Sequence, residues 1–149
     1  MCGPIEIIKL FSYIILGVLV VAIAYNQWIV AKNKLDLDLY NKRFEVYKDA
    51  LTFYQDLIGD EPSRDIHRKF IISKEAAFHL FSDSRDIYDL LNEMHENSAK
   101  VTGFKNLGNE LDGSPEQKMT MYNDSMQVLS WFDKSMPILR DKMSRYLKQ

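Results

Sequence analysis

Cysteine, glycine, proline and histidine are scarce in this chain of 149 residues. The single cysteine, Cys2, excludes an internal disulfide and any CxxC motif, which suits a reducing compartment. Glycine-rich phosphate-binding loops and the GxSxG, HExxH and DxDxDG motifs are absent from the sequence. The sequence therefore predicts no catalytic, cofactor-binding or metal-binding residue, and we expect that the protein is not an enzyme.

The three histidines, His67, His79 and His95, do not follow a metal-ligand pattern. On a helix, His95 points away from Glu93, two residues before it, and from Glu96 beside it, so these side chains cannot converge on one ion. We expect all three histidines to be surface side chains or hydrogen-bonded ones.

An excess of positive charge is also absent. From Leu35 onward the chain carries 16 Lys and Arg against 20 Asp and Glu, a formal charge of −4, and the two signs are interspersed. A basic patch able to follow a phosphate backbone is not apparent, so nucleic acid is not an expected partner.

A run of 22 residues without charge, Leu10 to Ala31, is the most prominent feature that is present. At about 1.5 Å per residue, a helix of this length matches the hydrocarbon core of a bilayer, about 30 Å. The run is longer than a typical signal-peptide core and no small-x-small cleavage site closes it, and lysines at both ends argue against a buried core helix. The sequence predicts a short tail over 1–9, a transmembrane helix over 10–31 and a helical domain over 32–149.

The charges that flank this run predict its orientation. Glu6 and Lys9 precede it, whereas Lys32 and Lys34 follow it directly and further basic residues come after them. Since Lys and Arg accumulate on the cytoplasmic side, we expect the amino terminus outside and the large domain in the cytoplasm. Tyr25 and Trp28 are expected at the membrane interface together with Lys32 and Lys34, because aromatic rings favour that depth.

Apolar residues of the domain recur at helical spacing, and no segment shows the sustained alternation of a strand. The spacing predicts an all-α fold, an antiparallel bundle of about four helices. The first helix is expected to reach Ile58, before Gly59 and Pro62. The second is expected over about 63–81. The third is expected over about 84–105, where "SDS" at 82–84 offers an N-cap, and its apolar row is expected to be Ile87, Leu90, Leu91, Met94, Ser98 and Val101.

The "SPEQ" segment at 114–117 predicts where the fourth helix begins. Ser114 at N-cap, Pro115 at N1 and Gln117 at N3 form a capping box. We expect the buried row of this helix to be Met119, Tyr122, Met126, Leu129 and Phe132, and we expect Pro137 to kink or break it near Ser135. A further row, Leu139, Met143, Tyr146 and Leu147, is expected after the proline.

A row of large apolar side chains in alternating steps of three and four marks the first helix: Leu37, Tyr40, Phe44, Tyr47, Leu51, Tyr54 and Ile58. We expect this row to be the central packing face of the bundle, with the Tyr47 ring largely buried. A second row beside it, Val46, Ala50, Phe53 and Leu57, indicates two packing neighbours. The alternative is a parallel coiled coil between subunits, which the short length and the wide apolar face disfavour. The packing and interaction candidates are Tyr40, Arg43, Phe44, Tyr47, Leu51 and Tyr54.

Arg43 lies between two positions of that row, close in sequence to the apolar run. It could make a charged contact with the membrane, a partner or an anionic ligand. We expect instead an exposed arginine that pairs with Asp36, Asp38 or lipid headgroups and adds little stability.

The segment "LDLDLYNKRFEVYKDALTF" resembles a loose group of small bacterial membrane proteins of unknown function, in which a single amino-terminal span precedes a "DL-[FY]-x-[KR]-RF-x-VY" helix. "EAAFHLFSDSRDIYDLL" at 75–91 is similar to the group's second recurring segment, and "VLSWF" followed by "RYL" is similar to its tail. The resemblance implies a bacterial inner-membrane protein with an anchored helical domain. It implies no catalytic residue.

These features favour a membrane-anchored, non-enzymatic protein that binds a protein partner or its own copies at the cytoplasmic face, so the expected partners are the lipid bilayer and protein. The alternative is an oligomeric membrane effector, as in toxin-like or antiphage defence systems, that perturbs the membrane when triggered. The span has no polar row to line a pore and no GxxxG motif, since Gly17 is its only glycine, and both features weigh against the alternative.

Overall fold

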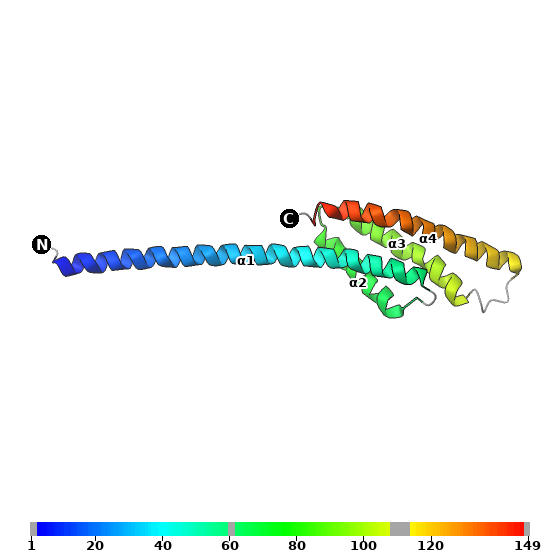
Figure 1. The fold of residues 1–149 in the computed structure, drawn as a ribbon, viewed down its shortest axis with the longest axis horizontal. Helices are drawn as coiled ribbons and strands as arrows, with labels where there is room; N and C mark the ends of the chain where they lie inside the picture. Colours follow the sequence, from blue (N-terminus) through cyan, green and yellow to red (C-terminus); the bar gives the residue numbers. More distant parts are fainter. Residues whose placement is uncertain (1–2, 60–61, 108–113, 148–149) are drawn as a thin grey trace. The chain divides into compact units, whose positions relative to one another are not determined.

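A computed structural model describes residues 3–59, 62–107 and 114–147, and within these the chain is all-α. Four helices follow one another: α1 (Pro4–Ile58), α2 (Arg64–Leu80), α3 (Arg85–Leu107) and α4 (Pro115–Ser144) (Figure 1). The chain divides into two compact units, Met1–Leu39 and Tyr40–Gln149, so that α1 contributes to both. The expected all-α fold is confirmed, and the expected tail is helical from Pro4 onward.

The first unit is the amino-terminal part of α1. It carries the one helix, in the described part of the chain, that is long and apolar enough to cross a membrane. Between residues 11 and 30 every side chain but the half-buried Ile29 is exposed. Within the described residues of this unit, the apolar surface is therefore uncovered.

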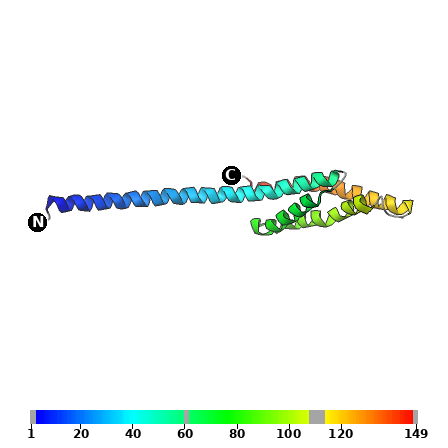
Figure 2. The same cartoon turned by 90° about the horizontal axis from the view of Figure 1, so that it is seen from below.

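The second unit is an up-and-down bundle of the last turns of α1 with α2, α3 and α4 (Figures 1 and 2). Successive helices run antiparallel, as predicted, because their connections are short. Local capping defines two helix starts. The Ser63 hydroxyl accepts from the Ile66 N–H at the start of α2, and the predicted capping box of Ser114 and Gln117 is formed at the start of α4.

The third helix begins where expected, but its predicted cap is different. The Ser84 hydroxyl donates to the Asp86 carboxylate and accepts from Arg145, so it does not cap the backbone of α3. The expected apolar row of α3 is confirmed, since Ile87, Leu91, Met94, Ser98 and Val101 are buried and Leu90 packs against them.

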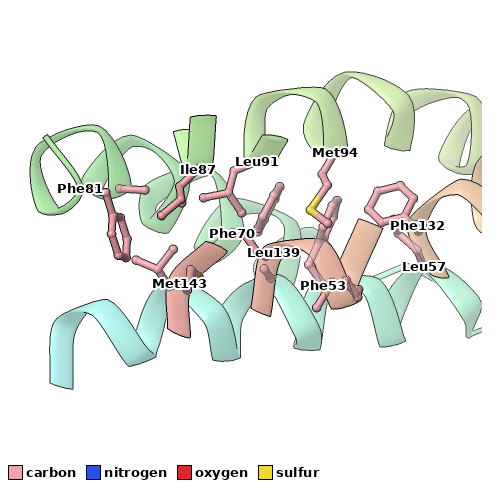
Figure 3. Close-up of a cluster of buried hydrophobic side chains, with 14 of the residues drawn as sticks. Phe53, Leu57, Phe70, Phe81, Ile87, Leu91, Met94, Phe132, Leu139 and Met143 are labelled. Atoms are coloured by element: carbon pink, nitrogen blue, oxygen red, sulfur yellow. The ribbon is translucent and has the colours of Figure 1, made fainter. Parts of the chain in front are cut away.

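A single hydrophobic core joins all four helices (Figure 3). Aromatic rings form its centre: Phe53 of α1 stacks on Phe70 of α2, with ring centroids 4.2 Å apart, and meets Phe132 of α4 edge-on at 6.3 Å. The largest fully buried side chains are Phe53, Phe70, Phe81, Phe132, Leu57, Ile87, Leu91, Met94, Leu139, Met143, Val46 and Val101.

The prediction of the central packing face of α1 is wrong, because the adjacent row of apolar residues faces the core. The residues that enter the core are Val46, Ala50, Phe53 and Leu57, which are at most 2% exposed. In the row that was expected to be central, Phe44 is 45% and Ile58 54% exposed. Tyr47, Leu51 and Tyr54 are half-buried and pack against the edge of the core. Of the two apolar rows of α1, the more deeply buried one therefore forms the centre of its packing face.

The predicted buried row of α4 is also wrong in its first half. Met119, Tyr122 and Met126 are exposed, whereas Ser125 and Val128 are buried. In the second half of the row, Phe132 is buried as expected and Leu129 packs against the core. The first turns of α4 lie beyond the end of α1 (Figures 1 and 2), and there Tyr122 meets only the edge of α3 through Phe104, with ring centroids 5.7 Å apart. The predicted break at Pro137 does not occur, because α4 continues through it to Ser144, whereas Leu139 and Met143 are buried as expected.

Candidate functional site

The apolar amino-terminal part of α1 carries the predicted membrane-interface residues. Tyr25 and Trp28 are both exposed, and their ring centroids lie 6.1 Å apart. The ammonium of Lys32 lies 5.8 Å from the centre of the Trp28 ring, and Lys34 is exposed two residues later. This sequence of exposed apolar, aromatic and basic side chains is typical of the edge of a membrane span.

Arg43 is a charged side chain of α1 that makes its contacts within the bundle. Its Nε donates to the carbonyl oxygen of Leu80 at 3.1 Å, where α2 ends. Its guanidinium lies 5.0 Å from the ring centre of Tyr146 and 5.8 Å from that of Phe81. A cation at the carboxyl end of a helix also interacts favourably with the helix dipole. The expectation of an exposed arginine paired with Asp36 or Asp38 is therefore wrong, since Arg43 joins α1 to the α2–α3 connection and to the carboxyl-terminal turn.

The other packing candidates divide into two groups. Tyr47, Leu51 and Tyr54 lie at the edge of the core, and the Tyr54 hydroxyl donates to the Asp133 carboxylate of α4 at 3.4 Å. Burial, together with the charge of Asp133, raises the pKa of the Tyr54 hydroxyl. Tyr40 and Phe44 stack on each other, with ring centroids 6.3 Å apart, and Phe44 remains largely exposed.

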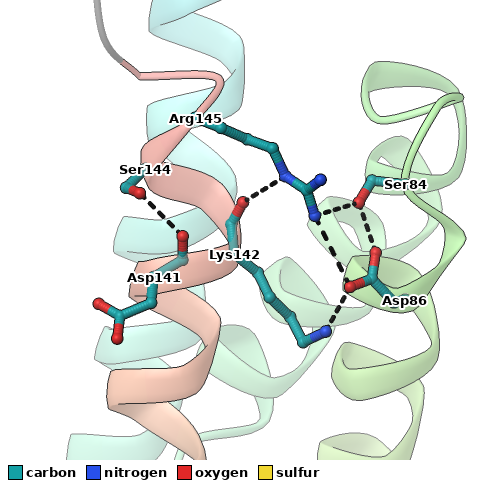
Figure 4. A network of polar contacts seen from close by, with 6 residues as sticks. All are labelled: Ser84, Asp86, Asp141, Lys142, Ser144 and Arg145. Carbon is teal, nitrogen blue, oxygen red and sulfur yellow. Dashed lines mark hydrogen bonds and ion pairs between the residues drawn. The ribbon is translucent and has the colours of Figure 1, made fainter.

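A polar network ties the start of α3 to the end of α4 (Figure 4). Lys142 pairs with the Asp86 carboxylate, and Arg145 donates to the Ser84 hydroxyl at 3.0 Å and lies 3.8 Å from Asp86. The hydrogen bonds from Lys142 and then from Ser84 hold the pKa of the Asp86 carboxyl below its ordinary value. The network fixes the same end of the bundle that Arg43 closes, because Arg145 also lies 5.4 Å from the Tyr146 ring centre.

A carboxylate is buried between α1 and α2. Asp49 is 5% exposed, accepts from the Ser73 hydroxyl at 2.5 Å and pairs with the exposed Lys69 at 2.9 Å. The bond to Asp49 raises the pKa of the Lys69 ammonium. Every oxygen of this carboxylate has a partner, which is how a buried charge is tolerated.

A second polar cluster lies between α2 and α3, and sequence reasoning missed it. The rings of His67 and His95 meet edge-on, with centroids 5.3 Å apart, and the Nε2 atom of His67 is buried without a hydrogen-bond partner. The buried ammonium of Lys74 lies nearby, 3.0 Å from the Asn92 side-chain oxygen and 2.9 Å from Glu75. Burial first, then Lys74 and His67, lower the pKa of the His95 imidazole. Helical spacing could not reveal this pair, because its members come from two helices.

A hollow of about 270 Å³ lies between α3 and α4. Its wall combines Trp131 and Val128 with the charged side chains of Glu93, Lys100 and Asp124. Charges of both signs line it, so the hollow favours no single ligand chemistry.

Among the described residues, no group of three His, Cys, Asp or Glu side chains lies close enough to hold a metal ion. Comparison of the chain with protein-family models, with curated proteins and with solved structures finds no match in any of the three. The function is therefore inferred from the chain's own residues.

Proposed function

We propose that this protein is a single-pass anchor at the bacterial inner membrane whose cytoplasmic bundle binds a protein partner or further copies of itself, without catalysis. The observation that carries the proposal is the helical segment over 11–30, whose large apolar side chains, except for Ile29, are 53–70% exposed. In water such a surface is strongly unfavourable, whereas in a bilayer it is the expected one.

The flanking residues support the membrane depth and the orientation. Exposed Tyr25 and Trp28, followed by Lys32 and Lys34, fit an interface on the side with more basic residues. The bundle beyond them also has exposed apolar side chains, among them Phe44 and Ile58 of α1, Ile72 and Phe78 of α2, and Met119, Tyr122 and Met126 of α4. These side chains are available for contact with protein.

Membrane fractionation with a matched pair of variants tests the anchor. Val20→Arg places a charge in the exposed apolar segment, and Ile72→Arg places the same charge at an exposed position of the bundle. An arginine at the centre of a span costs about 2.5–3.5 kcal/mol on insertion, so Val20→Arg should shift protein from the membrane to the soluble fraction. Ile72→Arg should remain in the membrane. Equal distribution of both variants and wild type would contradict the anchor.

The binding role and the orientation need separate measurements. A reporter that is active only in the cytoplasm should be active when it is fused to the carboxyl terminus. A reporter that is active only outside the cytoplasm should be inactive at the same position. Purification of the full chain in detergent, with crosslinking beforehand in the membrane, should return either a defined partner or an oligomer by mass. A protein that is monomeric and free of partners in both measurements would contradict the binding role.

A second candidate is an oligomeric membrane effector that perturbs the bilayer when its bundle receives a trigger. It is favoured by the helical assignment of residues 32–40, where no glycine or proline interrupts α1. A stiff helix transmits a rotation that a flexible linker would absorb. Overexpression of wild type should then lower the membrane potential, and insertion of Gly-Ser-Gly-Ser after Lys34 should abolish this effect. Unchanged potential on overexpression would count against the effector.

A further inference from the structure

The seam between α2 and α3 holds groups whose protonation the bundle does not accommodate. His67 lies on α2 and His95 on α3, and their rings meet at 5.3 Å and 65°. His67 also lies against Phe53 of α1 at 5.1 Å, so it sits where three helices meet. We infer that His67 and His95 form an acid-sensitive latch, which holds α2 against α3 while the His95 ring is neutral.

One edge of the His67 ring is buried, and its Nε2 atom has no hydrogen-bond partner among the described residues. A further N–H at this edge would be a buried donor without an acceptor. An added proton therefore has no partner here and would weaken the contact between α2 and α3.

A fixed positive charge next to the pair acts in the same direction. Lys74 is 6% exposed, and its ammonium is held by Asn92 and Glu75 and lies 5.7 Å from the Tyr88 ring centre. A second cation at either histidine would be repelled at short range in a partly buried site. The pKa of the His95 imidazole is lowered by burial first, and then by Lys74.

The neighbouring carboxylates do not reverse the lowering of the His95 pKa. They bind other groups, or they raise this pKa by too little. On α1, Asp49 is taken by Ser73 and Lys69, and Asp56 accepts from the Ser63 N–H. On α2 and α3, Glu75 and Glu96 raise the His95 pKa by less than the lowering causes, so the net direction stays downward. On α4, Asp133 accepts from the Tyr54 hydroxyl, and the same helix meets Phe53 through Phe132.

The sign of the pH effect follows from the His95 shift. The unfolded chain takes up this proton near the ordinary pKa of 6.5, whereas the folded chain takes it up only at lower pH. The stabilisation is therefore complete above about pH 6.5 and is lost as the pH falls through the folded pKa. Ordinary carboxyls stay ionised down to about pH 5, so acidification to pH 5.5 isolates the histidines.

Thermal unfolding of the full chain in detergent at pH 7.5 and pH 5.5 tests the latch. We expect wild type to melt at a lower temperature at pH 5.5 than at pH 7.5, because the unfolded chain takes up the His95 proton more readily than the folded chain does. The double variant His67→Phe, His95→Phe should lose this difference. His79→Gln, which removes an exposed histidine of α2, should keep it. An equal pH response in the double variant and wild type would overturn the latch.

A direct titration keeps the inference testable even where the double variant does not fold. Imidazole carbon and proton shifts of wild type, followed from pH 8 to pH 5, report each histidine separately. His95 should titrate below the ordinary value of about 6.5, and Lys74→Met should move its midpoint upward, because the nearby cation is removed. A midpoint at or above the ordinary value, unchanged in Lys74→Met, would overturn the latch. Neither result depends on membrane anchoring.

Discussion

The two units of this chain treat the same residue types in opposite ways. In the amino-terminal unit, phenylalanine, leucine, isoleucine and valine are exposed around the whole helix, as Phe11 and Leu16 illustrate. In the bundle, side chains of the same types form one connected core, as the fully buried Phe53 and Leu57 illustrate. A helix that is apolar on all sides is expected in an apolar environment, whereas a helix with one apolar row is expected to pack that row against neighbouring helices. Internal packing stabilises the second unit, whereas the first unit has no such packing among its described residues, which is the difference on which the proposed anchor rests.

The largest expected contrast comes from truncating one phenylalanine in each unit. Phe53→Ala removes a ring that stacks on Phe70 and meets Phe132, so the bundle should lose about 3–5 kcal/mol of unfolding free energy. Phe11→Ala, at a 60% exposed position, should leave the unfolding free energy of the bundle unchanged. Chemical unfolding of the full chain in detergent, followed by near-ultraviolet circular dichroism, measures both. Similar losses in the two variants would break the comparison.

A third variant separates the two rows of α1 within the bundle. Phe44→Ala, at a 45% exposed position of the row that the sequence suggested as central, should cost much less than Phe53→Ala. If Phe44→Ala lowers the mass of a detergent-purified oligomer while the fold is kept, this row is a seam between copies. The sequence alternative of an intermolecular contact would then be supported.

Helix content, helix limits and the core of α3 could be predicted because they depend on local chemistry. Ser63 and Ser114 cap α2 and α4, and Gly59 and Pro62 lie between α1 and α2, whereas Pro137 lies inside α4. The choice between two adjacent apolar rows could not be made in this way. Both rows of α1 have helical spacing, and only the positions of α2 and α4 decide that Val46 and Phe53 face inward.

The same reason explains the polar contacts that sequence reasoning missed. Arg43 bonds to Leu80 and lies over Tyr146, which is more than a hundred residues away along the chain. His67 and His95 come from different helices. A spacing rule within one helix cannot detect partners on another, so the candidate sites of this bundle became visible only in three dimensions.

Arg43 gives the next largest expected effect and compares a cation–ring contact in each unit. Arg43→Met removes the bond to the Leu80 carbonyl oxygen and the contacts with two rings, and should cost about 1–3 kcal/mol. Lys32→Met removes an exposed ammonium that lies 5.8 Å from the Trp28 ring centre, and should not change bundle unfolding. The same chemical unfolding experiment measures both. A stable Arg43→Met variant would show that the carboxyl-terminal turn packs without this cation.

Ser114 and Ser12 provide a smaller contrast between two hydroxyl groups. Ser114→Ala breaks the capping box at the start of α4 and should cost about 1 kcal/mol, since one free backbone N–H loses its acceptor. Ser12→Ala removes a hydroxyl that donates to the Lys9 carbonyl oxygen in the other unit, and should leave bundle stability unchanged. Urea midpoints of the full chain in detergent compare the two. An unchanged midpoint for Ser114→Ala would indicate that the α4 terminus frays before the bundle unfolds.

The smallest expected effect is confined to acid and concerns Asp86. Hydrogen bonds from Lys142 and Ser84 lower the pKa of this carboxyl in the folded chain, so the unfolded chain binds the proton at higher pH. The stabilisation is therefore present above the ordinary carboxyl pKa and is lost as the pH falls through the folded pKa. Asp86→Asn should flatten the decline of melting temperature below about pH 4, the region of ordinary carboxyl titration, and should change it little near pH 7, because the pair is partly exposed and screened. Glu6→Gln, in the amino-terminal unit, should leave the decline of wild type intact. An identical acid slope in Asp86→Asn and wild type would mean that the network of Figure 4 orders the end of the bundle without stabilising it.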